Sequence, residues 1–136
     1  MRYVIQEETT GCGIAAVANI VGINYKQAKA KANNLGIFAN DKALYSDTQY
    51  VRRLLKEYGK RSSTKELTFK SWQDLPDLAL LAIKFHHISD QPYWHWVVFV
   101  REGNNQYVID SNRSLKNPIR KDFWRMKPHW YISVSH

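Results

Sequence analysis

The segment QEETTGCGIAAVANIVG, residues 6–22, contains the only cysteine of the chain, Cys12, directly ahead of a run of small apolar residues. The nearly continuous apolar run from Cys12 to about Val21 predicts a helix, and Gly22 is a typical residue for its end. Backbone N–H groups at a helix start are unpaired and carry partial positive charge, which stabilises a thiolate. The segment therefore predicts that Cys12 is a nucleophile. The plainer interpretation of a lone cysteine is a small buried hydrophobe.

A cysteine nucleophile needs a base and a group that orients the base. His95 begins the apolar strand segment WVVFV, and Asp110 ends the next strand segment, YVI. A turn near residues 103–105 joins the two segments into a predicted hairpin. With residue 101 paired with residue 104, Asp110 is expected to lie roughly opposite His95, where its carboxylate would support the imidazole.

Gln6 lies six residues before Cys12. Its side-chain amide and the backbone N–H of Cys12 are predicted to hold a developing oxyanion together. Each of these residues also has a structural interpretation. His95 fits a core histidine, Asp110 fits the opening of a turn, and Gln6 fits an ordinary surface residue.

Two further groups of side chains lie near this predicted site. His86 and His87 are neighbours in the sequence, but no Cys/His spacing in the chain suits zinc. Adjacent residues of a strand point to opposite faces, so no metal site and no cofactor are predicted. Trp94 and Trp96 flank His95 and are predicted to pack in the core or to form walls of a cleft, rather than to stack on nucleic-acid bases.

The period of the apolar residues changes halfway along the chain. Asn24 is a predicted helix cap, and Ser46 with Gln49 fits a capping box. Helices are predicted over residues 12–21, 25–35 and 48–58, with a further helical turn at 71–75. Strands are predicted over residues 78–85, 94–101, 106–110 and 129–134, although a helix also fits 78–85. Helices followed by antiparallel strands indicate an α+β domain.

Composition sets the broad class of protein. A chain of 136 residues with 44% apolar and 24% charged residues is typical of one globular domain with a single core. A single cysteine excludes an internal disulfide. No apolar run is long enough for a membrane span or a secretory signal, which indicates a cytoplasmic protein unless other factors export it. The net charge of +8 leaves a nucleic-acid binder open, but the basic residues are scattered and no binding motif is visible.

The order Gln6, Cys12-Gly13 at the start of an apolar helix, His95 on a strand and Asp110 after the next strand resembles the papain superfamily. The short length and the segment QEETTGCGIAAVANI are most similar to the bacteriocin-leader (double-glycine) peptidase domains, which are usually fused to ABC exporters. The resemblance implies one papain-like domain over residues 1–136, with N-terminal helices packed against a C-terminal antiparallel sheet. It implies that Cys12 is the nucleophile, His95 the base, Asp110 the orienting group and Gln6 an oxyanion donor.

The sequence also departs from that family. These 136 residues include neither a membrane region nor an ATPase, and Ser111 follows Asp110 where the exporter-fused domains commonly have proline. Two settings stay open for a papain-like hydrolase acting on a peptide or protein. One is maturation of a precursor that a separate exporter transports, with cleavage after a double glycine as one option. The other is a toxin or effector delivered by a larger secretion system, with an immunity protein as partner, which acts by cleavage, deamidation or amide transfer. A catalytically idle papain-like binding domain is the non-enzymatic alternative.

Overall fold

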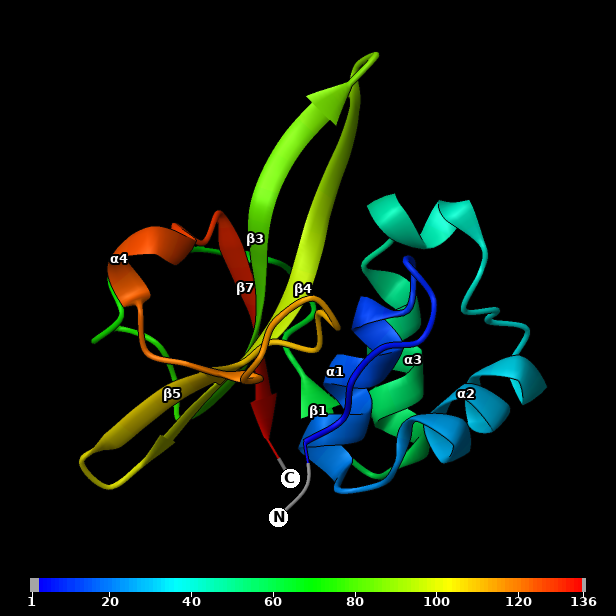
Figure 1. Ribbon diagram of the computed structural model, residues 1–136, viewed down its shortest axis with the longest axis horizontal. Coiled ribbons are helices and arrows are strands. Elements are labelled where there is room, and N and C mark those ends of the chain that lie inside the picture. Colours follow the sequence, from blue (N-terminus) through cyan, green and yellow to red (C-terminus); the bar gives the residue numbers. More distant parts are fainter. Residues whose placement is uncertain (1–2, 136) are drawn as a thin grey trace.

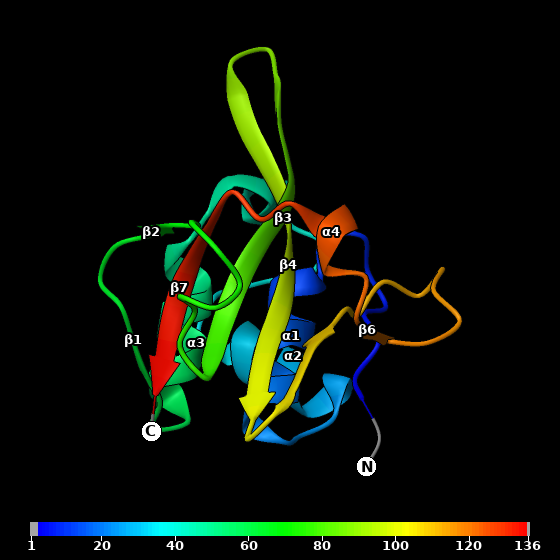
Figure 2. The ribbon, with the colours of Figure 1, turned by 90° about the vertical axis from the view of Figure 1, so that its left-hand side faces the viewer.

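The computed structural model describes residues 3–135, so residues 1, 2 and 136 of the predicted domain lie outside the described residues. The first half is helical and the second half is a mixed set of long and short strands, which confirms the α+β prediction. Figures 1 and 2 show the N-terminal helices packed on one face of the sheet, with the short helix at residues 123–126 on the other side. The helices are α1 (Cys12–Val21), α2 (Tyr25–Asn34), the 3-10 helix η1 (Lys42–Ser46), α3 (Gln49–Glu57) and α4 (Phe123–Met126).

The strands of residues 3–135 form a seven-stranded antiparallel sheet in the order β1-β7-β3-β4-β5-β6, with β2 also paired to β7. Their bounds are β1 (Arg61–Ser62), β2 (Leu67–Thr68), β3 (Leu78–Ile88), β4 (Gln91–Glu102), β5 (Asn105–Ile109), β6 (Ile119–Arg120) and β7 (Trp130–Ser135). Alternate residues of β3 and β4 are buried on opposite faces, so both faces carry apolar packing. The N-terminal helices cover one face, and the segment around Trp72 together with α4 covers the other.

Helix α1 is the centre of the helical layer, and its start is held by two tyrosines. It begins at Cys12 and ends at Gly22, which adopts a left-handed conformation with φ 85, as predicted. A Cβ atom on Gly11 would overlap the hydroxyl of Tyr25 from α2, and a Cβ atom on Gly13 would overlap the hydroxyl and ring of Tyr50 from α3. The two glycines beside Cys12 are therefore places of close approach, where only a hydrogen atom fits.

Strands β3 and β4 form a long arm that projects from the body of the protein (Figure 1). Both strands run further than the predicted 78–85 and 94–101, because the polar segment between them continues the pairing. Ser89 and Asp90, both with positive φ, make the two-residue turn at its tip. The pairing shifts register between Ile83 and His86, and Lys84 has φ 55 at this bulge.

Three local predictions are wrong in detail. The capping box at the start of α3 is absent: the Asp47 side chain accepts from the Gln49 N–H, while the Ser46 hydroxyl donates to the Pro92 carbonyl. Residues 71–75 form hydrogen-bonded turns and no helix. Asp47 supplies the acceptor that was expected of Ser46, and the carbonyls of Trp72 and Leu75 accept hydrogen bonds from Arg101, which is distant in the sequence.

The third correction concerns the hairpin of β4 and β5. Glu102 pairs with Asn105 and Val98 with Ile109, so the register differs by two positions from the predicted one. Continuing this register puts Asp110 beside Val97 rather than opposite His95. A two-residue offset keeps both side chains on the same face, where diagonal neighbours still meet.

Candidate active site

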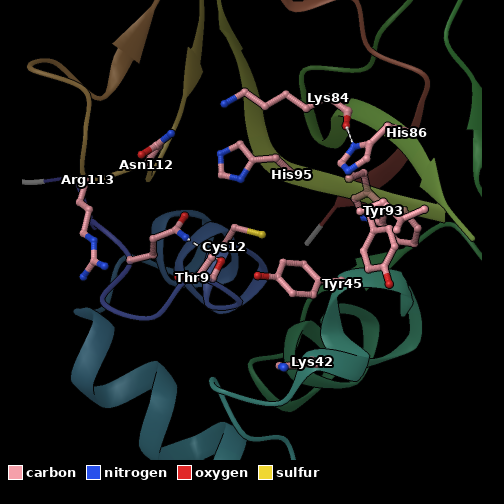
Figure 3. Close-up of a pocket in the computed structure, with 13 residues that line it drawn as sticks. Thr9, Cys12, Lys42, Tyr45, Lys84, His86, Tyr93, His95, Asn112 and Arg113 are labelled. Atoms are coloured by element: carbon pink, nitrogen blue, oxygen red, sulfur yellow. Dashed lines mark hydrogen bonds between the residues drawn. The ribbon is translucent and has the colours of Figure 1, made fainter. Parts of the chain in front are cut away.

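Cys12 lies at the floor of a cleft of about 630 Å³ between the start of α1, helix η1 and the β3–β4 arm. Its exposed fraction is only 7%, so the sulfur is recessed. Gln6 and His95 also line the cleft, and Figure 3 shows the His95 ring on the side of Cys12 that faces the sheet. The structure thus brings three of the four predicted site residues to one cavity.

The His95 ring is held by Asp110, the fourth predicted residue. The ring Nε2 lies 2.7 Å from Oδ1 of Asp110, which leaves Nδ1 for Cys12. Burial acts to lower the pKa of His95, but hydrogen bonds with Asp110 and Cys12 outweigh it and raise the pKa to about 9. The imidazole is therefore poised to stay protonated at neutral pH, next to the cysteine sulfur.

Asp110 is fully buried and all its polar contacts are satisfied within the protein. Oδ1 also accepts from the backbone N–H of Asn112 at 3.0 Å, and Oδ2 accepts from Nη1 of Arg120 at 2.9 Å. Burial acts to raise the pKa of Asp110, yet the hydrogen bond to His95, its positive charge and the remaining donors lower the pKa to about 2. The carboxylate is therefore ionised over the whole neutral range.

Arg120 is a site residue that the sequence analysis missed. Strand β6 pairs with β5, with Arg120 opposite Val108, and this brings the guanidinium to Asp110. Its other donors form a bidentate pair with Asp122, at 3.1 and 2.9 Å. The sequence shows only a basic dipeptide at residues 120–121, and no local pattern there signals contact with a residue ten positions earlier.

Gln6 is tied to the residue after Asp110. Its backbone N–H donates to the Ser111 carbonyl at 3.0 Å, and its Oε1 accepts from the Ser111 hydroxyl at 2.9 Å. Nε2 donates to the carbonyls of Glu8 and Thr9, at 3.1 and 3.2 Å. Three fixed partners set the orientation of the amide, and the N–H₂ group is turned toward the loop that leads into Cys12. Ser111, noted above as a departure from the family pattern, is thus the residue that links Gln6 to Asp110.

The aromatic and histidine side chains divide between cleft and core. Trp94 lines the cleft, whereas Trp96 is 1% exposed and lies in the core, where it packs edge-on against Trp94. The prediction that these tryptophans pack in the core or form cleft walls therefore holds for both, with Trp94 in the cleft and Trp96 in the core. His86 lines the cleft with its Nδ1 on the carbonyl of Lys84, and His87 packs against Phe85. Over residues 3–135, no group of three or more metal-ligating side chains is gathered at one place.

In the part of the chain that the structure describes, none of the helices combines the length and the apolar character needed to cross a bilayer. The sequence matches no family model and no curated protein sequence. The structure is similar to a solved structure described as a double-glycine-motif protease from an AMS/PCAT transporter in complex with the leader peptide. The TM-score is 0.61 at 14% sequence identity, and the match covers 98% of this chain and 89% of that chain. This likeness supports a papain-like fold.

Proposed function

We propose that this protein is a cysteine peptidase whose catalytic triad is Cys12, His95 and Asp110. The observation that carries the proposal is the pairing of a recessed cysteine at a helix start with a histidine that a buried carboxylate holds at 2.7 Å. The order of nucleophile, base and orienting group in space is the arrangement that thiol hydrolysis requires. The fold-level likeness to a double-glycine-motif protease agrees with it.

In the proposed reaction, the Cys12 thiolate attacks the carbonyl carbon of the scissile peptide bond. The backbone N–H of Cys12 and Nε2 of Gln6 stabilise the oxyanion, for which one Nε2–H must leave the carbonyl of Glu8 or Thr9. His95 then gives its proton to the leaving amine, and the C–N bond breaks to leave a thioester. The neutral imidazole next takes a proton from water, which attacks the thioester and releases the acid and Cys12.

The proposed substrate is a peptide cut after two glycines. The sulfur is recessed and Trp94 lines the same cleft, so residues without side chains approach the sulfur with the least obstruction. A precursor presented in the cytoplasm by a separate exporter fits such a substrate.

The test is single-turnover hydrolysis of a peptide series that differs only in the pair before the cut: Gly-Gly, Ala-Ala and Leu-Leu. Mass spectrometry identifies the bond that is cut. We expect cleavage after Gly-Gly, and none by Cys12→Ala or His95→Ala. Equal rates on all three peptides would contradict the proposed double-glycine preference. Cleavage that persists in Cys12→Ala would remove the mechanism, and toxicity in cells that depends on Cys12 without cleavage of any peptide would favour an effector instead.

A further inference from the structure

The cleft that contains Cys12 is lined by three cations from three separate elements. Lys42 comes from η1, Lys84 from the bulge of β3, and Arg113 from the loop after Asp110. The chain has 12 acidic residues, yet none of them is among the residues that line this cleft. In Figure 3 the three cations lie on three different sides of Cys12.

The positive charge of these side chains is not neutralised within the protein. Other cations of the molecule pair with carboxylates, as Arg52 does with Glu66. Over residues 3–135, no carboxylate lies within ion-pair distance of Lys42, Lys84 or Arg113. The guanidinium of Arg113 donates only to a backbone carbonyl, at 2.7 Å.

The position of Lys84 is fixed by the backbone. Its φ of 55 lies in the left-handed region, which is costly for a residue with a side chain, and it sits where the β3–β4 pairing shifts register. In Figure 3 the exposed side chain extends past the His95 ring, along the rim of the cleft. Bulges of this kind re-aim side chains near active sites, so the backbone directs this lysine to the rim of the cleft.

Two acidic residues lie close to two of these cations without pairing with them. Glu7 and Glu8 line a neighbouring hollow together with Lys42 and Arg113, but neither carboxylate forms an ion pair with these two cations, and neither lines the cleft that contains Cys12. The Glu8 carboxylate is held by the hydroxyl of Tyr25 at 2.9 Å and by Nζ of Lys29 at 3.2 Å, on the side of α2.

We infer that the cleft selects a peptide segment that carries acidic side chains on both sides of the bond to be cut. This inference rests on the proposed function and specifies its substrate class. Opposite charges across a binding site speed encounter and fix orientation. The three cations flank Cys12, so acidic residues on both sides of the scissile bond meet a partner when the bond lies over the sulfur.

The experiment separates binding from cleavage. Three fluorescent peptides share a Gly-Gly core and are flanked on both sides by pairs of Glu, Gln or Lys residues. Fluorescence anisotropy with full-length Cys12→Ala measures their dissociation constants. Three exposed ion pairs of ordinary strength change a dissociation constant by about tenfold, so we expect the Glu peptide to bind about tenfold more tightly than the Gln peptide. At about 0.5 M salt, where the Debye length is about 4 Å, this preference should vanish.

Charge reversal identifies the cations. Lys84→Glu and Lys42→Glu, each combined with Cys12→Ala, should each lose most of the preference for the Glu peptide. Lys65→Glu, an equal change in net charge at an exposed residue that does not line the cleft, should keep this preference. Two reversal variants are used so that a folding defect in one leaves the other to decide.

Four outcomes would overturn the inference. They are equal binding of the three peptides, a preference that Lys65→Glu removes as well, a preference that survives both cleft reversals, and tighter Lys84-dependent binding of a single-stranded oligonucleotide. The proposed function is judged separately, because cleavage of the three peptides by the wild type at equal rates would leave it standing. Selective binding of the Glu peptide without cleavage would instead contradict the proposed peptidase activity and support the inference of an acidic ligand.

Discussion

Replacing Asp110 with asparagine tests the arrangement in which one buried carboxylate serves two partners. Its Oδ1 accepts from His95 and Oδ2 accepts from Arg120. An asparagine has only one acceptor oxygen. If that oxygen stays with His95, the amide N–H₂ faces the donors of Arg120. We therefore expect Asp110→Asn to keep a substantial part of the hydrolysis and to lose much of its stability, whereas Asp110→Ala should lose more activity because the His95 ring is freed.

The expected loss of stability in Asp110→Asn follows from the charge and the hydrogen bonds of Asp110. The pKa of Asp110 is lowered from 3.8 to about 2, which corresponds to about 2 kcal/mol of stabilisation by the ionised form. A lowered carboxyl pKa contributes stability above pH 3.8 that disappears as the pH falls through about 2, so at pH 7 the substitution forfeits all of it. A buried donor that faces another donor costs about 1–3 kcal/mol more. The expected loss is about 3–5 kcal/mol in the free energy of unfolding.

A double-mutant cycle with Arg120→Met isolates the bridge. Arg120→Met alone leaves Oδ2 of Asp110 buried without a partner, but in the double variant no donor faces the asparagine amide. The combined loss should therefore fall short of the sum by about 2 kcal/mol. Urea unfolding at pH 7, followed by the fluorescence of the five tryptophans, measures all four proteins. If Asp110→Asn is within about 1 kcal/mol of the wild type, or if the losses add to within about 0.5 kcal/mol, Asp110 does not bridge the two partners.

Three other predictions concern the nucleophile, its base and the helix that holds them. Because the pKa of His95 is raised to about 9, its contribution to stability is complete below pH 6.5 and is lost as the pH rises through about 9; urea midpoints should fall over this window in the wild type and change less in His95→Ala. Iodoacetamide should alkylate Cys12 faster in the wild type than in His95→Ala at the same pH, because the imidazole lies beside the sulfur; equal rates in the two proteins would contradict the pairing of Cys12 with His95. Gly13→Ala should destabilise the fold by about 1–3 kcal/mol in urea unfolding, because the added methyl group overlaps Tyr50. Adding Tyr50→Phe should recover part of that loss. If Gly13→Ala leaves the free energy of unfolding unchanged, α1 and α3 separate easily.

Local patterns in the sequence were sufficient for α1 and α2, although not for η1 or for the start of α3. The apolar run after Cys12 and the left-handed glycine at its end fix the bounds of α1, and both were predicted. Asn24 caps α2 through a reciprocal pair with Gln27, as its position before the helix indicates. In these segments the partners are within four residues of each other, so the sequence contains the whole interaction.

The site depends on contacts that no local pattern encodes. The pairing of β5 with β6 brings Arg120 to Asp110, and Ser111 meets Gln6 across 105 positions of the chain. The register of the β4–β5 hairpin is set by a two-residue turn that starts at Gly103, with φ 61, which the sequence analysis placed differently. Local patterns and the resemblance to a known family together supplied the candidate residues, but only the folded chain supplies the groups that hold them.

For the proposed peptidase, the arm of β3 and β4 would limit which proteins can be attacked. Between His95 and the tip, β4 extends for about 13 Å at about 3.3 Å per residue, beside a sulfur that is itself only 7% exposed. The rounded surface of a folded globule cannot follow the arm down to that depth, whereas a single extended strand of polypeptide can. Native proteins would then be cut only in tails and loops, or at the rate at which a segment transiently unfolds. Susceptibility to cleavage would then depend on the local unfolding equilibrium of the substrate protein as much as on the bond that is cut.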